Sequence, residues 1–173
     1  IQVVDVNGDP VDTAGILVTA GLASGSGTLT GTTTATTDGN GRATFSNLAI
    51  QGLIGTKSIG FSASQVTGVQ ATGFSLTAGA AATLTANSTT SQTGGQGQPV
   101  GTKPSVKASD LDGNGVAGVG VTFAITAGAG SLTGGSQSTN SNGIATVGSW
   151  TLDAAAGLNT MTATAAGLGG SPQ

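Results

Sequence analysis

The sequence of 173 residues contains no cysteine, no histidine and no glutamate. Without cysteine the chain has no disulfide to stabilise it, so a folded state must rest on backbone hydrogen bonds and packing. Without cysteine and histidine it also lacks the soft ligands that zinc and copper prefer. A serine or threonine nucleophile needs a neighbouring base, and the usual histidine or glutamate is missing. We therefore expect a protein that is not an enzyme and that carries no cofactor.

Charged residues are scarce as well, at 6% of the chain. Seven aspartates and four lysines and arginines give a formal net charge of -3 at pH 7. No basic patch is available to neutralise phosphates, so we expect no nucleic-acid partner. The sequence has no run of about 18 apolar residues, and this argues against a membrane span in this chain.

Small residues are abundant, and 32 residues are glycine. A chain rich in glycine, threonine, serine and alanine disfavours long amphipathic helices. With so little lysine, the composition is typical of an exported bacterial protein. We expect a secreted protein of the bacterial cell surface or of an extracellular filament. The sequence begins at Ile1 without a signal peptide, which we expect to have been removed or to lie outside this sequence.

The sequence contains two copies of one pattern. The matching segments are residues 5–11 with 110–116, 27–31 with 130–134, 40–45 with 142–147, and 55–61 with 157–163. We therefore predict two modules, residues 1–79 and residues 80–173, the second with a short C-terminal tail. Residues 80–104 precede the first matching turn of the second module, whereas only residues 1–4 precede that of the first. The first module is therefore expected to lack its first strand.

Apolar residues alternate with small or polar ones in both copies, for example at Val119, Val121, Phe123 and Ile125. A period of two is that of a half-buried β-strand. Between such runs, asparagine and glycine supply the positive-φ residues of tight turns. The predicted turns are Asn7-Gly8, Asn40-Gly41, Asn114-Gly115 and Asn142-Gly143. These patterns predict an all-β fold of two tandem immunoglobulin-like antiparallel β-sandwiches.

The same alternation predicts the two cores. In the first module the predicted core residues are Ile16, Val18, Leu29, Phe45, Leu48, Ile59 and Phe61. In the second they are Val121, Phe123, Ile125, Leu132, Val147, Trp150, Leu152 and Met161. Trp150 could instead stack on a sugar ring, as aromatic residues do in carbohydrate-binding modules. Its alignment with Leu48 and the low aromatic content, 3%, favour a core position.

One turn of the second copy resembles half of a calcium-binding loop. Asp110, Asp112 and Asn114 have the alternating spacing of the first ligands of an EF-hand loop, followed by Gly115. Val121 occupies the position of the closing bidentate glutamate, so the second half does not match. A hydrogen-bonded turn is therefore favoured over a calcium site. The same reasoning applies to a paired-carboxylate mechanism at these aspartates, or at Asp5 and Asp9 in the first copy, since both pairs lie in glycine-rich turns.

Three segments of the second copy carry a family likeness: residues 110–123 (DLDGNGVAGVGVTF), 142–146 (NGIAT) and 157–163 (GLNTMTA). Together they resemble the bacterial Ig-like domain, type 1, which is repeated in intimin-like and invasin-like surface adhesins. The resemblance covers nearly all of the second module and the first from its second strand onward. It implies an Ig-like sandwich, an extracellular location and a role as a rigid spacer in a stalk. No segment resembles the terminal lectin-like domain that binds receptors in those adhesins.

Three functions are compatible with these observations. The leading hypothesis is a structural module that acts as a stalk or spacer in an adhesin-like tandem array. The second is a subunit of a self-assembling extracellular filament, in which a neighbouring chain donates the strand that the first module lacks. Such assembly would join neighbouring modules or identical subunits head-to-tail. The third hypothesis, which has less support, is an accessory binding module of a secreted polysaccharide-degrading enzyme.

Overall fold

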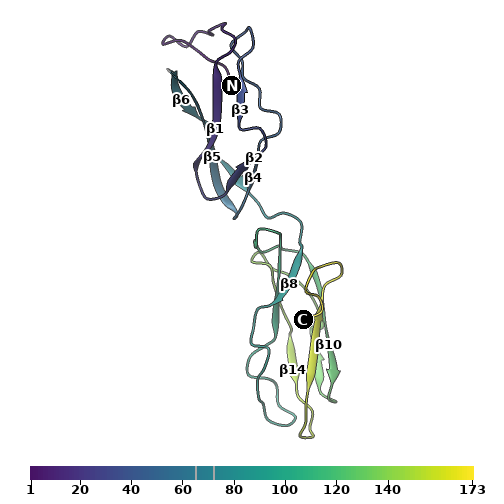
Figure 1. Ribbon diagram of the computed structural model, residues 1–173. Helices are drawn as coiled ribbons and strands as arrows, with labels where there is room; N and C mark the ends of the chain where they lie inside the picture. The colour runs from purple at the N-terminus through teal and green to yellow at the C-terminus, as the bar shows by residue number, and fades with distance from the viewer. Residues whose placement is uncertain (65, 72) are drawn as a thin grey trace. The chain divides into compact units, whose positions relative to one another are not determined.

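The computed structural model describes residues 1–64, 66–71 and 73–173. The chain divides into two compact units, Ile1–Thr77 and Ala78–Gln173, which we call unit 1 and unit 2. Every regular element of the described residues is a strand, and the ladders between strands are antiparallel (Figure 1). The predicted all-β class is therefore confirmed. Among the same residues no helix is long and apolar enough to cross a membrane.

Most strands of both units are short. Unit 1 contains β1 (Leu17–Ser24), β2 (Thr28–Thr30), β3 (Thr34–Thr36), β4 (Ala49–Gln51), β5 (Gly55–Ala63), β6 (Val66–Gln70) and β7 (Phe74–Leu76). Unit 2 contains β8 (Thr83–Ala86), β9 (Ser105–Ser109), β10 (Gly120–Ala127), β11 (Ser131–Thr133), β12 (Ser136–Ser138), β13 (Ile144–Thr146), β14 (Ser149–Thr151) and β15 (Thr160–Thr164).

Unit 2 buries its core between two sheets. One sheet joins β13, β9 and β8, and the other joins β12, β10 and β15. The period of two along β10 directs Val121 and Phe123 into a buried cluster that includes Leu84 of β8. β11 pairs with β14, which places Leu132 opposite Trp150. Two antiparallel sheets around one apolar core form an immunoglobulin-like sandwich.

Unit 1 repeats this plan but differs at two sheet edges. β1 pairs with β3 and β5 as β10 pairs with β12 and β15. Residues 1–4 pair with residues 41–43 as β9 pairs with β13, and Val3 N–H donates to Gly41 C=O at 3.0 Å. No described residue of unit 1 lies along residues 1–4 in the place of β8. Conversely, β5 carries β6 and β7 along its outer edge, where β15 carries neither.

The core of unit 1 is smaller than the sequence pattern predicts. Phe45 and Phe61 are only half-buried, and their rings meet at a tilt with centroids 5.3 Å apart. The buried apolar residues of unit 1 are Val3, Val18, Ala20 and Ala43. In unit 2, by contrast, Phe123 and Trp150 are both buried. Large side chains therefore fill the core of unit 2 better than that of unit 1.

One aromatic ring changes strand between the two copies. On the first pair of strands Ala20 of β1 lies opposite Phe61 of β5. On the corresponding pair Phe123 of β10 lies opposite Ala163 of β15. Each copy thus combines one phenylalanine with one alanine at this place, with the positions exchanged. Total side-chain volume is conserved, and cores tolerate changes of this kind best.

Trp150 does not correspond to Leu48, so the predicted alignment was wrong. In unit 1 Leu29 lies opposite Ile50, and in unit 2 Leu132 lies opposite Trp150. The counterpart of Trp150 is therefore Ile50. The reason is that the segment between β13 and β14 of unit 2 is shorter than the corresponding segment of unit 1, and a sequence match cannot place such a deletion.

The predicted turn glycines are correct at three of four places. Positive φ angles are found at Gly8 (+88°), Gly41 (+69°) and Gly143 (+78°). At the fourth turn the positive φ belongs to Gly113 (+85°) and not to Gly115, so the prediction for Gly115 was wrong. Gly115 is required for a different reason, because a Cβ there would lie 2.1 Å from the carbonyl oxygen of Asn142. Its small size lets two loops of unit 2 touch.

Candidate functional site

The side chain of Asp110 organises the turn that follows β9. Its Oδ1 accepts hydrogen bonds from the backbone N–H groups of Asp112 at 3.0 Å and Asn114 at 2.9 Å. Its Oδ2 accepts from Gly79 N–H at 2.9 Å and from the side-chain amide of Asn114 at 3.0 Å. Asp110 and Asn114 are buried, whereas the side chain of Asp112 is exposed. The structure thus brings Asp110 and Asn114 together, and Asp112 takes part through its backbone.

These four bonds decide what the turn can bind. A carboxylate offers about four lone-pair positions, and each oxygen of Asp110 already accepts two N–H groups. Calcium needs about six to eight oxygen ligands. Within the described residues no three Asp, Glu, His or Cys side chains come together to hold a metal ion. The geometry therefore favours the hydrogen-bonded turn over the calcium site at Asp110, Asp112 and Asn114.

The same contacts set the charge of Asp110. Burial raises the pKa of this carboxyl, but the hydrogen bonds, led by that from the Asn114 side chain, outweigh burial and hold the pKa below its ordinary value. A general acid at neutral pH needs the opposite shift. Asp110 therefore stays ionised as an acceptor for its own turn and is poorly suited to proton transfer.

Asp5 builds the corresponding turn in unit 1 with fewer partners. Its Oδ1 accepts from the N–H groups of Asn7 at 2.8 Å and Asp9 at 3.0 Å. Its Oδ2 accepts from the Asn7 amide at 3.4 Å, and the side chain is exposed. In unit 2 the additional donor, Gly79 N–H, belongs to the segment just before β8. The described part of unit 1 has no such segment, so Asp5 remains open to solvent where Asp110 is covered.

A buried threonine, which no sequence pattern singled out, holds another turn in each copy. Thr139 Oγ1 donates to Val116 C=O at 2.6 Å and accepts from Val119 N–H at 2.9 Å. Thr37 makes the same two bonds in unit 1, at 2.7 and 3.0 Å. Threonine is too frequent in this chain for one residue to stand out. The available signal was the repeated spacing of threonine three residues before an Asn-Gly pair.

The residue after each threonine caps the next turn. Asp38 Oδ1 accepts from the N–H groups of Asn40 at 2.9 Å and Arg42 at 3.0 Å. The backbone hydrogen bond from Arg42 and, to a smaller extent, the one from Asn40 lower the pKa of the Asp38 carboxyl. Asn140 makes the same two bonds in unit 2 without a charge, at 2.9 and 3.0 Å. What both copies use at this position is an acceptor oxygen, as in an Asx turn.

Trp150 is 9% exposed. Its backbone C=O accepts from Val100 N–H at 2.9 Å, and its side chain faces that of Leu132 across the β11–β14 ladder. Its indole N–H is buried and has no hydrogen-bond acceptor among the described residues. A ring that stacks on a sugar needs an exposed face. At this burial the ring contributes to packing, which is the core position that the sequence favours.

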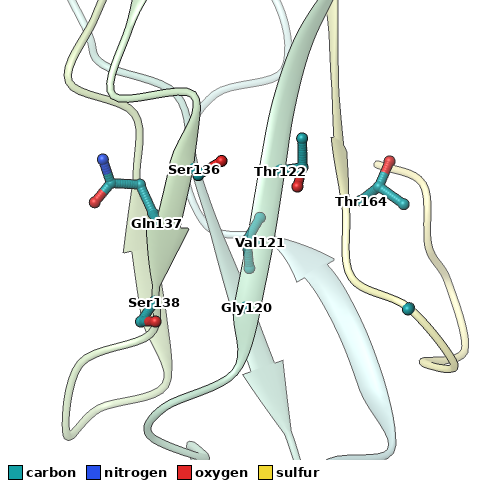
Figure 2. A pocket seen from close by; sticks show the side chains of 8 residues that line it. Gly120, Val121, Thr122, Ser136, Gln137, Ser138 and Thr164 are labelled. Atoms are coloured by element: carbon teal, nitrogen blue, oxygen red, sulfur yellow. The ribbon is translucent and has the colours of Figure 1, made fainter.

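A shallow hollow lies on the outer face of one sheet of unit 2. Ser136, Thr122 and Thr164 form a row across β12, β10 and β15 (Figure 2). They border an open hollow of about 750 Å³. Its lining offers hydroxyl groups and the Gln137 amide, and none of the lining residues carries a titratable side chain. The hollow can therefore provide hydrogen bonds, but it contains no acid or base for catalysis.

Comparison with known proteins gives a likeness in fold alone. No protein-family model matches the chain, and no curated protein matches its sequence. Among solved structures, the D0-D1 domain of intimin is similar at 23% identity and a TM-score of 0.37, over 94% of this chain and 79% of that one. Invasin, described as a bacterial integrin-binding protein, is similar at 20% identity and a TM-score of 0.38. That match covers 98% of this chain and 32% of the invasin chain.

Proposed function

We propose that the chain is a non-enzymatic structural module of a bacterial surface or extracellular protein, in which residues 1–79 and 80–173 are separate Ig-like modules that act as spacers in a stalk. The observation that carries this proposal is the use of the polar side chains. Asp5, Asp38 and Asp110 all direct their carboxylates at backbone N–H groups of their own turns. A repeated unit whose polar groups hold its own backbone supplies length and stiffness rather than chemistry.

The resemblance of residues 110–123, 142–146 and 157–163 to the bacterial Ig-like domain, type 1, supports the same assignment. In that family the repeat itself has no catalytic motif. The composition, poor in lysine, free of glutamate and rich in threonine and alanine, supports an extracellular location. We assign the chain to this kind of domain on those grounds.

Stretching single molecules of the full chain tests the spacer function. Two separately folded spacers should unfold in two force peaks. Each peak should release the contour length of one module, about 270 Å for the 77 residues of Ile1–Thr77 and more for Ala78–Gln173. A single peak that releases the whole chain would contradict two independent spacers. Specific, saturable binding of a polysaccharide would favour the accessory-module hypothesis instead.

A second function, filament assembly by strand donation, is favoured by one observation at residues 1–4. Val3 directs its N–H to Gly41 and its C=O to Val11, so the backbone groups of Gln2 and Val4 point to the opposite edge. No described residue of unit 1 pairs with that edge. In unit 2 the corresponding edge of β9 is covered by β8, whose Leu84 is fully buried. A strand from another subunit would find both unpaired backbone groups and apolar surface there.

Light scattering of the purified full chain tests this second function. Strand donation predicts head-to-tail oligomers whose mass grows with concentration. A peptide with the sequence of residues 80–88, which contains β8, should compete for the edge and return the chain to monomers. A chain that stays monomeric at high concentration, with or without the peptide, would contradict assembly and leave the spacer proposal intact.

A further inference from the structure

Four Asn-Gly pairs occur in the sequence, beginning at Asn7, Asn40, Asn114 and Asn142. In such a pair the backbone nitrogen of the glycine can attack the side-chain amide carbon of the asparagine, because glycine has no Cβ to obstruct the approach. The attack closes a five-membered succinimide ring. It needs a free asparagine side chain, a glycine N–H that can leave its hydrogen bond, and room for the backbone to rotate. The four pairs differ in all three respects.

Three of the pairs are held in place by buried contacts. Asn114 is buried, and its side-chain amide donates to Asp110 Oδ2 at 3.0 Å. Gly41 and Gly143, which follow the other two asparagines, are buried as well. The C=O of Gly143 accepts from Ala108 N–H at 2.8 Å, so this glycine is joined to β9. A succinimide at any of these pairs can form only after such contacts break.

The pair Asn7-Gly8 is the most open of the four. Both residues are exposed, and a Cβ at Gly8 would meet no atom within 4 Å. The side-chain amide of Asn7 donates to Asp5 Oδ2 at the long distance of 3.4 Å. Gly8 N–H donates to Asp5 C=O at 3.1 Å, and water can replace this bond because the turn is exposed. This pair therefore meets the three requirements in the folded state.

The openness belongs to the turn itself, as the corresponding pair of unit 2 shows. Asp112 and Gly113 are exposed too, although Gly79 N–H donates to Asp110 beside them. Gly113 has a φ of +85° where Gly8 has +88°, and its N–H donates to Asp110 C=O at 3.2 Å. The two turns thus have one geometry, and in unit 2 that geometry carries an aspartate where unit 1 has an asparagine.

We propose that Asn7 is a site of spontaneous covalent modification, which converts this residue to aspartate and isoaspartate without an enzyme. The Gly8 nitrogen gives up its proton to hydroxide and bonds to Cγ of Asn7, while the side-chain nitrogen takes a proton from water and leaves as ammonia. Water then opens the succinimide. Addition at Cγ gives aspartate, and addition at the backbone carbonyl carbon gives isoaspartate. The proposal does not depend on the spacer function.

The two products have different effects on the turn. Aspartate leaves the main chain unchanged, as Asp112 does in unit 2. Isoaspartate adds one carbon to the main chain before Gly8, so Asp9 N–H loses its alignment with Asp5 Oδ1, which it reaches at 3.0 Å. Amide exchange at Asp9 should therefore be faster in the purified isoaspartate product than in the Asn7→Asp variant. Equal exchange would contradict this consequence.

The test is incubation of the full chain at mildly alkaline pH, followed by digestion and tandem mass spectrometry. The mass gain from replacing NH₂ by OH is located at each asparagine. We expect Asn7 to convert at least about tenfold faster than Asn40, Asn114 or Asn142, because those three react only after local opening. The rate should rise with pH, since the attack needs a deprotonated nitrogen. Asn7→Gln is the control variant, because a six-membered ring closes far more slowly, and it should abolish conversion at position 7 alone.

A free peptide with the sequence of residues 3–12 shows what the folded turn does to the reaction. It should convert, and the folded chain should convert at Asn7 during the same incubation. Three results would overturn the proposal. Conversion of the peptide without conversion of the folded chain would show that the turn protects Asn7. Equal rates at all four pairs would show that the reaction proceeds through unfolding, and faster conversion at Asn40 or Asn142 would place the reactive site elsewhere.

Discussion

The two units have the same turns and different edges. Asp5 and Asp110 both accept the N–H groups of their own turns, yet only Asp110 has a further donor, from the segment before β8. The hydroxyl groups of Thr37 and Thr139 form hydrogen bonds with corresponding backbone groups of their units. Among the described residues none pairs with residues 1–4 in the place of β8, and the outer edge of β15 pairs with Gln173 where that of β5 pairs with β6 and β7. The local hydrogen bonds of the repeat are thus constant, and strand pairing at the edges is what varies.

This difference shows which interactions define the module. Bonds inside a turn join residues close in the sequence, so each copy carries its own complete set. An edge strand is joined to the module by a ladder and by apolar contact only, and another segment with suitable alternation can supply both. The turns are therefore where each module keeps its shape, and the edges are where the two copies differ.

The largest expected effect is at the buried tryptophan. Trp150→Ala should destabilise unit 2 by about 3–5 kcal/mol, because it leaves a cavity opposite Leu132. Ile50→Ala, the matched change in unit 1, should cost less since Ile50 is only half-buried. Urea unfolding followed by circular dichroism measures both. Equal costs would show that the two cores are filled to the same degree and would contradict the better filling of unit 2.

The next effect separates the two aspartate turns. Asp110→Ala removes the acceptor of Gly79, Asp112 and Asn114 and should cost unit 2 about 2–3 kcal/mol. Asp5→Ala should destabilise unit 1 less, because its partners are exposed and water can replace the carboxylate. Asp110→Asn separates the two sets of bonds, since it keeps one acceptor oxygen for the Asp112 and Asn114 N–H groups and loses the acceptor of Gly79. If the melting temperature falls equally in both alanine variants, the hydrogen bond from Gly79 N–H adds nothing to the stability of unit 2.

The exchanged aromatic ring predicts a coupling between two positions. Phe61→Ala should leave a gap in unit 1, and Ala20→Phe should crowd the Phe45–Phe61 contact. The double variant restores the arrangement of unit 2 and should recover about 0.5–3 kcal/mol relative to the sum of the single changes. Denaturant unfolding of the four proteins measures this coupling energy. Strict additivity would show that the exchange of strands between the copies is not compensatory.

The smallest effect is the dependence of stability on pH. The folded-state pKa is lowered at Asp5, Asp38, Asp110 and Asp153. Such carboxyls stabilise the fold fully above the ordinary aspartate pKa of about 4, and this contribution is lost as the pH falls through the lowered value. We expect a melting temperature that is constant near neutrality and falls below about pH 4. Asp110→Asn should make the melting temperature of unit 2 fall less steeply at low pH. A melting temperature that begins to fall well above pH 5 would contradict the lowered pKa values of these aspartates.

Much of the fold follows from local sequence patterns. The period of two predicts strands such as β10, and the Asn-Gly pairs predict turns at Gly8, Gly41 and Gly143, because both depend on neighbouring residues only. The error at Gly115 has the same origin. Asp112-Gly113 and Asn114-Gly115 are both turn signals, and only the packing of Gly115 against Asn142 decides between them.

Features that depend on distant segments could not be predicted in this way. The counterpart of Trp150 was misplaced because a shorter loop shifts the register before β14. The buried threonines, Thr37 and Thr139, act across about twenty residues and have no distinctive local pattern. The donor from Gly79 to Asp110 joins two segments 31 residues apart, so the burial of that carboxylate is visible only in the structure.

Amide hydrogen exchange on the full chain tests most directly the claim that the copies share their turns and differ at their edges. Val4 and Ser109 are counterparts, and only Ser109 has a strand beside it, paired with Thr83 of β8. We predict that Val4 exchanges at nearly the unfolded rate, while Val3, which donates to Gly41, is protected within the same unit. Ser109 should exchange slowly. If Val4 is as protected as Val3, the edge at residues 1–4 is already paired, and the account is wrong.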